Sequence, residues 1–504
     1  MNQNKLIVLS IVIFTATFIQ WLPTTGFGFI NFDDPRFIEE NPLIYLHPLK
    51  TFYHSITTVV MSNWIPLTFA SFSLDYHLYG LNAPGFHLTN IIFHACNAVL
   101  VFYIFFILLE KFYPQSNKSY LNAIFAAISS LLWANHPFRV EAVAWVSARK
   151  DVLFMFFCLF SIIFYLKYIS NLLKSKTDSF LLNRFYLLSI LMMILSLLSK
   201  GMAVTLPFVF LIVDYLYKRN DYKRAIMEKI PFFILSVLFS YIQILTRPTT
   251  LPDTNELSLS IRIINACSGL GFYLEKTLFP LNLVPVYYYE GHKPDYFIYI
   301  FISGLASVLL LTILFLKGNR FVKASVIFYI ITLLPVIGIM QTWIQEYADR
   351  FSYFPTLPLY LGFGIAGIKL VHYISSPRMK VRTVTNNHFI LCAKYKILLL
   401  SSVIFFIYTF LCSKQIMLWE TPYTLWNHQI NVRPHPLPYL VLGDYSMTQK
   451  NPQKALDYYT RGYQSYPQST LFLPRISIVK KLLNNHQDNV VKEIDSKLLQ
   501  PHNN

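Results

Sequence analysis

The sequence is poor in charge: only 13% of its 504 residues are Asp, Glu, Lys or Arg, whereas 55% are hydrophobic and 17% are aromatic. Soluble chains carry roughly a quarter charged residues, so a soluble globular enzyme of this length is excluded. The apolar residues gather in runs of about 17 to 25 residues, the length that crosses the hydrocarbon core of a bilayer. The composition therefore predicts a polytopic helical membrane protein.

Cysteine is scarce, and no two cysteines have the spacing of a disulfide framework or of a zinc site. The cysteines are scattered through apolar or membrane-adjacent runs, at Cys96, Cys158, Cys267, Cys392 and Cys412. The chain also lacks a P-loop, a G-x-S-x-G element and an H-E-x-x-H element. The sequence motifs of nucleotide-driven transporters and of the common hydrolase classes are therefore absent. The energy for a reaction then has to arrive with the substrate.

The net charge of +17 does not mark a nucleic-acid-binding protein. Most Lys and Arg residues lie in short segments between apolar runs, as the positive-inside rule requires. No basic face with interleaved aromatic residues lies outside these runs, so nucleic acid is not an expected partner. The first apolar run follows Lys5 and ends at Leu22 without an A-x-A-like cleavage site, which predicts an uncleaved first span.

Eleven spans are predicted from the apolar runs, which places the two termini on opposite sides of the membrane. The spans cover 5–23, 87–109, 120–135, 151–169, 185–199, 201–217, 230–246, 296–316, 322–340, 354–374 and 397–413. With the N-terminus inside, the basic segments 217–229, 317–320 and 376–396 are cytoplasmic. The outer face then receives the loops 24–86, 136–150, 247–295 and 341–353 and the chain from 414 onward.

The first outer loop contains a helical pattern of aromatic residues. Ile65, Phe69, Phe72, Tyr76 and Tyr79 follow one another at spacings of 4, 3, 4 and 3, which is the helical period. The pattern fits a helix in the membrane interface with its aromatic face in lipid, and it fits equally a helix packed on the bundle.

Beyond residue 413 the sequence changes to soluble character and contains one clear repeat, 436–469. Its small and aromatic residues fall at the positions of a tetratricopeptide repeat, a pair of helices in about 34 residues. These residues are Leu442, Gly443, Ala455, Tyr459, Gly462 and Pro467. One helix pair cannot bury its own hydrophobic face, so the segments on either side should pack on it. The predicted domains are 1–413, in the membrane, and 414–504, on the outer face.

A candidate site begins in the stretch INFDDPRFIEENP, 30–42, directly after the first span. Asp33 and Asp34 form an acidic pair there. A carboxylate in a partly dry interface has a raised pKa, which makes it a better base toward a hydroxyl. Alternatively, one aspartate caps a short helix that begins at Pro35. The two roles are compatible if one aspartate is the base and the other is the helix cap.

The second outer loop lies in the stretch NHPFRVEAVAWVSARKDVL and carries many ionisable side chains at the ends of two spans. Ionisable side chains beside the membrane core cost free energy, so they indicate a function. Arg and Lys suit a phosphate, whereas His and Glu suit hydroxyls. A network of ion pairs that caps the spans is the alternative, and Trp145 fits an interfacial anchor. The candidate residues are His136, Arg139, Glu141, Arg149, Lys150 and Asp151.

Other outer loops supply more polar candidates, which are Arg36, Asn41, Lys200, Arg247, Asp349 and Arg350. Basic residues from several loops thus converge on the face that holds the acidic pair, while the centres of the spans are nearly free of charge. This distribution suits a lipid-linked phosphate donor better than it suits transport. A polyprenyl-phosphate sugar brings its own energy, because its phosphate is a leaving group.

Several motifs in this order, followed by a tetratricopeptide repeat, resemble the transmembrane and tetratricopeptide-repeat-containing O-mannosyltransferase family and its bacterial relatives. They read NFDDPRFIEENP, GFHLTNIIFHACNAVLVF, HPFRVEAVAWVSARKDVL, LLSKGMAVTLP and YADRFSYFPTLP. The resemblance covers about residues 1–470. It implies the GT-C glycosyltransferase fold, an inverting transfer from a lipid-phosphate sugar and an extracytoplasmic active site.

Carried over residue by residue, the resemblance assigns the acidic pair of the first outer loop to Asp33 and Asp34. The H-P-x-x-x-E-A-V-A-W element of the family corresponds to 136–145, with Glu141 as its acid. The G-R-x-D-L segment corresponds to 148–152, with Ala in place of Gly and Val in place of Leu. The lysine segment, often S-K-E in relatives, has Gly201 in place of the glutamate.

The sequence thus predicts an all-α polytopic membrane protein, a GT-C-like bundle of about eleven transmembrane helices with a small C-terminal tetratricopeptide-repeat domain. The predicted activity moves a mannose-like hexose from a polyprenyl-phosphate donor to a hydroxyl acceptor, protein Ser or Thr, with inversion. Asp33, Asp34 and Glu141 are the catalytic candidates, and the other candidates bind substrate. No metal site is predicted, although carboxylates can recruit a divalent ion.

The expected partners are the bilayer, the polyprenyl-phosphate sugar and a protein or glycan acceptor that docks on the repeat. The expected membrane is the bacterial inner membrane with a periplasmic active site, or the endoplasmic reticulum of a eukaryote. Two alternatives stay open. One is a glycolipid- or polysaccharide-modifying transferase of the same fold, and the other is a non-catalytic scaffold that binds proteins through its repeat.

Overall fold

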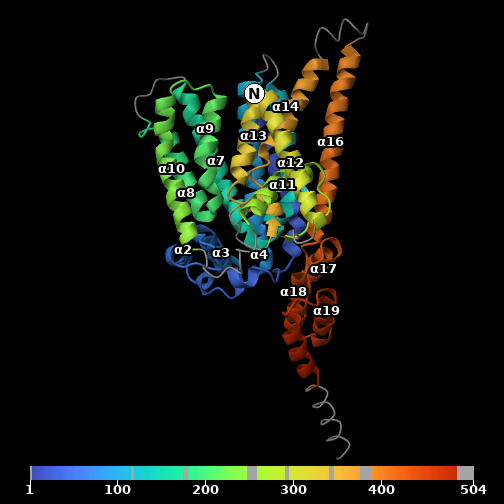
Figure 1. The fold of residues 1–504 in the computed structure, drawn as a ribbon. Helices are drawn as coiled ribbons and strands as arrows, with labels where there is room; N and C mark the ends of the chain where they lie inside the picture. The colour runs from blue at the N-terminus through green and yellow to red at the C-terminus, as the bar shows by residue number, and fades with distance from the viewer. Residues whose placement is uncertain are drawn as a thin grey trace, which may run out of the picture. The chain divides into compact units, whose positions relative to one another are not determined.

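The computed structural model describes residues 3–114, 119–173, 180–246, 258–289, 294–339, 345–374 and 387–484 (Figure 1). The chain divides into two compact units. The first, Met1–Phe29 with Asp34–Met417, is a helical bundle, and the second, Ile30–Asp33 with Leu418–Asn504, is a small helical domain. The acidic pair is divided between them, because Asp33 belongs to the second unit and Asp34 to the first.

Seven helices in the described part of the chain are long and apolar enough to cross a membrane. They are α1 (Gln3–Trp21), α4 (Ala83–Phe112), α7 (Arg149–Leu172), α10 (Tyr222–Leu245), α12 (Pro294–Lys317), α14 (Leu357–Ile374) and α16 (Asn387–Met417). Shorter helices occupy the other predicted spans: α5 (Ser119–Ala134), α8 (Arg184–Ser199), α9 (Leu206–Leu216) and α13 (Arg320–Leu333). The prediction of an all-α membrane bundle is confirmed.

Small hydroxyl residues let neighbouring helices of the bundle approach closely, as is usual in membranes. Between α7 and α8, Ser161 Oγ donates to the Ser189 carbonyl at 2.7 Å and Ser189 Oγ donates to the Ser161 carbonyl at 2.9 Å. The helices α7 to α10 stand side by side as one group of the bundle (Figure 1). The hydroxyls therefore bind helices together without placing a charge at the centre of a span.

The predicted outer loop 247–295 contains a long helix, α11 (Leu259–Leu278), which hydrophobic run length did not predict. The helix packs against α12, and an added Cβ on Gly304 would lie only 3.2 Å from Cys267 Cβ. Ser, Asn, Glu and Lys interrupt the apolar residues of α11, and for this reason it did not resemble a span. A short antiparallel pair of strands follows: β1 (Tyr287–Tyr288) and β2 (Gln345–Tyr347), with Tyr287 opposite Tyr347.

Two helices of the first outer loop, α2 (Pro48–Thr57) and α3 (Pro66–Tyr79), run across the ends of α8 and α10 (Figure 1). Thr68 Oγ1 donates to the Ser199 carbonyl at 3.0 Å, and Gln243 Nε2 donates to the Trp64 carbonyl at 3.0 Å. On α3, Phe69 and Phe72 are fully buried in a protein core. Of the two alternatives for this aromatic face, the structure therefore shows packing on protein, not on lipid.

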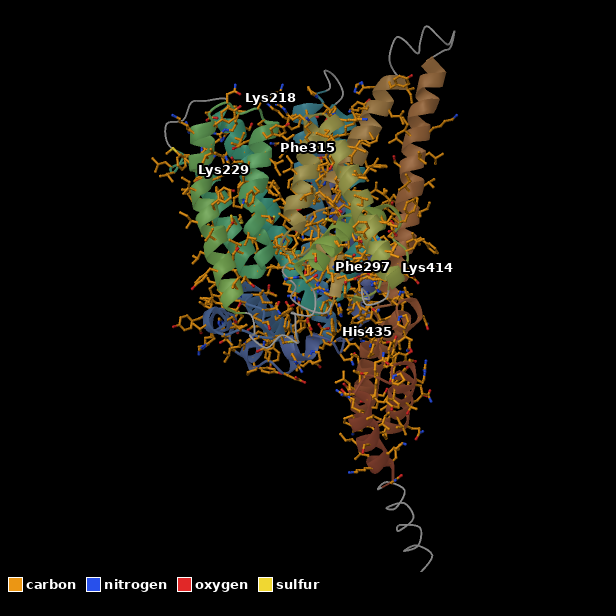
Figure 2. All side chains as sticks on the ribbon, in the orientation of Figure 1. Lys218, Lys229, Phe297, Phe315, Lys414 and His435 are labelled. Carbon is orange, nitrogen blue, oxygen red and sulfur yellow. The ribbon has the colours of Figure 1, made fainter. Side chains whose placement is uncertain are left out.

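The opposite end of the α7 to α10 group is closed by buried charges. Arg219 Nη1 lies 2.5 Å from Glu228 Oε2, and Lys229 pairs with Asp214. Figure 2 shows Lys218 and Lys229 at this end, away from α2 and α3. Because each buried charge has an opposite partner, the cluster can be stable without a ligand.

In the second unit, α17 (Pro422–Val432), α18 (Pro436–Thr448) and α19 (Pro452–Ser465) pack together. An added Cβ on Gly443 would lie 2.2 Å from the Tyr459 ring, so α18 and α19 touch where only glycine fits. The 30–33 segment joins this unit through Phe32, whose ring centroid is 5.4 Å from that of Trp426. A helix pair thus lies at the position of the predicted repeat.

Candidate active site

Asp34 is fully buried and is bonded to Ser147 of the second outer loop. Its Oδ1 accepts a hydrogen bond from the Ser147 backbone N–H at 2.9 Å and another from Ser147 Oγ. The chain makes a π-helical turn at Pro35–Glu39 without a side-chain cap, so the capping role considered for this aspartate is wrong for Asp34. Its carboxylate instead fixes the first outer loop to the second.

The second outer loop folds into successive short helical turns, Pro137–Arg139, Val140–Ala144 and Val146–Ala148, and its side chains are buried. His136 begins the first turn, because its Nδ1 accepts from the Phe138 N–H at 3.2 Å and Pro137 follows at the first helical position. The run ends at Arg149, where α7 begins. Each turn aims a different side chain inward, so residues close in sequence reach different partners.

Glu141 and Arg350 form a bidentate pair. Arg350 donates its backbone N–H to Glu141 Oε2 at 2.7 Å and its guanidinium Nη1 to Oε1. Burial raises the pKa of Glu141, and the positive charge of Arg350 opposes this shift only in part. Strand β2 leads directly into the turn Asp349–Ser352, which presents Arg350 to the acid.

Lys200 pairs with Asp151 at the start of α7. Burial lowers the pKa of the Lys200 ammonium, and Asp151 opposes this shift. One aromatic ring lies beside both cations: Phe351 is 5.4 Å from Lys200 Nζ and 4.9 Å from the guanidinium carbon of Arg350. The side chains of Lys200 and Arg350 keep 13% and 12% of their surface exposed. These two cations therefore lie together near the surface of the bundle.

Lys150 joins the same group through Trp145. The Trp145 ring is 6.0 Å from Lys150 Nζ and 5.5 Å from the guanidinium carbon of Arg350. Because Trp145 is buried, its interpretation as an interfacial anchor was wrong. Lys150 also lies 4.9 Å from the Phe37 ring, three residues after Asp34. The Asp34 site, as defined here, comprises Asp34, Glu141, Lys150, Asp151, Lys200 and Arg350.

Arg149 turns away from this group into a closed network. Its Nη2 donates to Asp75 Oδ2 at 2.5 Å and to the Phe86 carbonyl at 2.8 Å, and its Nε donates to Asn90. Burial raises the pKa of Asp75, although Arg149 opposes the shift. The side chain of Arg149 is fully buried, so its contacts support the ion-pair alternative at this position.

Three other sequence candidates are buried among protein groups. His136 Nε2 lies 3.1 Å from the Thr277 carbonyl, and Arg139 Nη2 donates to Thr356 Oγ1 at 3.0 Å. Asp349 Oδ1 accepts from Tyr287 Oη at 2.8 Å. Burial is the first cause that raises the pKa of Asp349, and the neighbouring Glu141 charge is the second. These contacts position the loops around the Asp34 site.

The remaining sequence candidates lie elsewhere. Asn41 begins the turn Pro42–Tyr45, because its Oδ1 accepts from the Leu43 N–H at 3.1 Å. Arg36 is exposed and Asp33 is half-buried. Arg247 lies outside the described residues.

Sequence reasoning missed Ser147, Asp75 and Phe351. Asp75 could have been identified from the sequence, because it is an acid within a helical pattern of aromatic and aliphatic residues. A carboxylate in such a position needs a partner. Ser147 and Phe351 carried no signal of their own, because a serine and a phenylalanine are ordinary residues at the ends of spans.

Chemically, the Asp34 site combines a buried carboxylate with Lys150, Lys200 and Arg350. Arginine and lysine are the residues that bind phosphate groups, and arginine does so with two parallel hydrogen bonds. Within the described ranges, no group of three or more His, Cys, Asp or Glu side chains is arranged to hold a metal ion.

No family model matches the chain. It is 30% identical to the protein O-mannosyl-transferase F38B6.6 of Caenorhabditis elegans over 227 residues, which is 43% of this chain and 29% of that protein. It is 32% identical to human TMTC4 over 144 residues, 28% of this chain and 19% of that protein. It is 34% identical to human TMTC3 over 146 residues, 27% of this chain and 14% of that protein. Both human proteins are also named protein O-mannosyl-transferases.

The resemblance to protein O-mannosyl-transferases is confirmed. The chain spans less than a third of the length of each of these relatives. Among solved structures, ArnT from Cupriavidus metallidurans bound to undecaprenyl phosphate aligns with 93% of this chain and 89% of its own, at 12% identity and a TM-score of 0.37. A similarity of this degree does not establish a common fold, so the GT-C topology stays a prediction.

Proposed function

We propose that this protein is a membrane glycosyltransferase of the polyprenyl-phosphate-sugar type. It transfers a mannose-like hexose to the hydroxyl of a protein Ser or Thr, with inversion, on the extracytoplasmic face of the membrane. The observation that carries the proposal is the Asp34 site. There the buried Asp34 carboxylate is bonded to Ser147, and the aromatic neighbours Trp145 and Phe351 lie beside Lys150, Lys200 and Arg350. The similarity to O-mannosyl-transferases supports the same chemistry.

In the proposed reaction, Asp34 is the general base. The acceptor hydroxyl gives its proton to the Asp34 carboxylate, and its oxygen forms a bond to the anomeric carbon of the sugar. The bond between that carbon and the phosphate oxygen breaks, and its electron pair leaves with the polyprenyl phosphate. A single displacement of this kind inverts the anomeric configuration.

The cations stabilise the phosphate as its negative charge grows. Fixed positive groups are effective here because they need no reorganisation during the reaction. Two acids hold these cations in place: Glu141 pairs with Arg350, and Asp151 pairs with Lys200. In this proposal Glu141 is a positioning residue.

The test is sugar transfer by the full chain in proteoliposomes, with radiolabelled polyprenyl-phosphate mannose and a Ser- and Thr-rich acceptor peptide. Asp34→Asn should lower kcat by about 10²- to 10⁴-fold, the contribution of a general base. Asp33→Asn and Glu40→Gln are the matched controls, because Asp33 belongs to the other unit and Glu40 is an exposed acid of the same loop. Both controls should retain activity.

Undiminished transfer by the Asp34→Asn variant would remove this mechanism. Transfer to glycolipid or polysaccharide but not to peptide would favour the glycan-modifying alternative. A wild-type chain that is inactive with every polyprenyl-phosphate sugar would favour the non-catalytic scaffold.

A further inference from the structure

The first outer loop passes from one compact unit to the other and back within a few residues. Ile30–Asp33 is grouped with Leu418–Asn504 in the second unit, whereas the chain up to Phe29 and from Asp34 to α16 belongs to the first. Phe29 packs on Phe86 of α4, with ring centroids 5.5 Å apart. The chain therefore leaves the first unit after Phe29 and returns to it at the carboxylate that we propose as the base.

Two side chains attach the 30–33 segment to the helices of the second unit. Asn31 Nδ2 donates to the Val441 carbonyl of α18 at 3.2 Å. The Phe32 ring meets the fully buried Trp426 ring of α17 edge to face, at an interplanar angle of 78°. A hydrogen bond and an edge-to-face ring pair are both directional contacts. They therefore fix the position of the segment on α17 and α18.

The helices that hold the segment are bonded to one another. Tyr423 Oη of α17 lies 3.1 Å from Ser446 Oγ of α18. Asn427 Nδ2 of α17 donates to Tyr458 Oη of α19 at 3.3 Å. Both residues of α17 lie within one helical turn of Trp426. A displacement of α17 is therefore shared by α18 and α19, and the attached segment moves with the three helices.

Only one residue separates Phe32 from Asp34. Consecutive Cα atoms are about 3.8 Å apart, so the two Cα atoms lie within about 7 Å of each other in any conformation. After Asp34 the chain is anchored again, because the buried Phe37 packs on Phe69 with ring centroids 5.6 Å apart. The Asp34 carboxylate, which accepts from the Ser147 N–H at 2.9 Å, thus follows an anchor in the second unit and precedes one in the first.

We propose that the second unit holds Asp34 against Ser147 through the 30–33 segment. Phe32 and Asn31 are then positioning residues. The coupling runs along the chain itself, so it acts in cis and is separate from any acceptor that the second unit binds. The placement of Asp34 does not depend on the chemistry of the site, whereas the effect on catalysis rests on the proposed function.

The test measures how fast Asp34 reacts with a water-soluble carbodiimide and glycine ethyl ester, by peptide mass spectrometry of the full chain in detergent. In the wild type the buried Asp34 should react slowly, and the exposed Glu40 is the internal reference for fast reaction. Phe32→Ala should raise the rate at Asp34 by roughly 2- to 10-fold, the factor that one aromatic pair contributes. Phe32→Tyr keeps the ring and should restore the slow reaction.

Tyr466→Ala is the matched control, because its half-buried ring pairs with Tyr439 within the second unit at a centroid distance of 6.3 Å. Asp34 should react in this variant as in the wild type. Asn31→Ala is a milder second variant that removes only the bond to α18, and it should give a smaller rise at Asp34. Unchanged reactivity of Asp34 in every folded variant of Phe32 and Asn31 would overturn the proposal. An equal rise in Tyr466→Ala would also overturn it, because the effect would then be a general loosening of the unit.

Sugar transfer in proteoliposomes tests the catalytic consequence. Phe32→Ala should lower kcat by a similar factor and leave the KM for the donor unchanged, since the acids that hold Lys200 and Arg350 are not altered. In an Asp34→Asn background, Phe32→Ala should lower kcat no further, and a further loss would contradict an action through Asp34. Raised reactivity of Asp34 without any loss of kcat would support the positioning of Asp34 by the second unit and would contradict its proposed role as the base.

Discussion

Ser147 determines the position of the Asp34 carboxylate, because both its backbone N–H and its hydroxyl donate to Oδ1. Ser147→Ala removes the hydroxyl but keeps the backbone bond. A hydrogen bond to a charged group contributes about 1.5–3 kcal/mol, so kcat should fall by about 10- to 100-fold with little change in KM for the donor. Steady-state transfer in proteoliposomes measures both constants.

Ser161→Ala is the control for this prediction, because Ser161 is also a buried serine at a helix contact, and its hydroxyl bonds to Ser189 of α8, away from Asp34. Its kcat should match that of the wild type. An unchanged kcat in Ser147→Ala would show that Ser147 does not orient the base.

Asp349 makes stability depend on pH. Burial and the Glu141 charge raise its pKa well above the ordinary value of 3.8, so the folded state binds this proton more tightly than the unfolded state does. Stability from this group is therefore fully present below about pH 4 and is lost as pH rises toward the raised pKa. Thermal unfolding in detergent should give a Tm that falls, as pH rises above about 4, less steeply in Asp349→Asn than in the wild type.

The exposed Glu40→Gln variant is the control, and its Tm should follow that of the wild type across the same range. Parallel wild-type and Asp349→Asn curves would mean that Asp349 does not titrate in this window. The Tyr287 hydroxyl can donate to an amide oxygen at position 349 as it does to the acid, so the variant keeps this bond.

At the scale of elements, close helix contact favours glycine at position 443 in the second unit. A Cβ there would meet the Tyr459 ring at 2.2 Å, and this ring is held by a hydrogen bond from Tyr459 Oη to Asp444. Gly443→Ala should destabilise the α17 to α19 unit by about 1–3 kcal/mol, the usual cost of overpacking. Hydrogen exchange of this unit in the full chain measures the effect.

Gly362→Ala is the matched control, since its Cβ would have nothing within 4 Å. Exchange in α17 to α19 should be faster only in the Gly443 variant. Equal exchange in both variants would contradict the close packing of α18 on α19.

The buried charges that close the α7 to α10 group depend on one another. Asp214→Asn leaves Lys229, whose side chain is fully buried, without its nearest acid. Removing one partner of a buried ion pair costs about 3–5 kcal/mol, so the Tm should fall clearly. Glu275→Gln removes an acid that is half exposed in its pair with Lys276, and its Tm should be nearly unchanged.

An unchanged Tm in Asp214→Asn would mean that Lys229 finds another partner, for which Glu228 at 3.6 Å is in reach. Thermal unfolding of Asp214→Asn and Glu228→Gln side by side separates these cases. If Glu228 is the alternative partner, the double variant loses more than the sum of the two single variants.

At the scale of the whole molecule, hydrophobic run length predicted the helices of the bundle, because a span must satisfy its backbone hydrogen bonds internally. Helix α11 was missed, since its apolar residues face protein on one side only and its polar residues break the run. The sequence also did not predict which charged side chains pair with one another. Arg149 and Lys150 are neighbours, yet one bonds to Asp75 and the other lies by Trp145, because successive helical residues point about 100° apart.

The acidic pair shows the same limit. Asp33 and Asp34 are indistinguishable by motif, whereas the structure places them in different compact units and buries only Asp34. The sequence resemblance predicted which loops form the candidate site. Which side chains of those loops meet depends on the turns at 137–148 and 349–352, whose geometry no local pattern specifies.

Lys200 and Arg350 are each neutralised in advance by an acid, and Lys150 and Asp34 bring the Asp34 site to three positive and three negative side chains. A site of this kind has no surplus positive charge with which to trap stray inorganic anions from the medium. In the proposed reaction, a phosphodiester that enters gives the site one excess negative charge, and transfer itself leaves this charge unchanged because Asp34 takes up the acceptor proton. Once Asp34 releases that proton, the phosphate monoester gives the site a second excess negative charge. We therefore expect deprotonation of Asp34 to favour the exit of the spent lipid carrier.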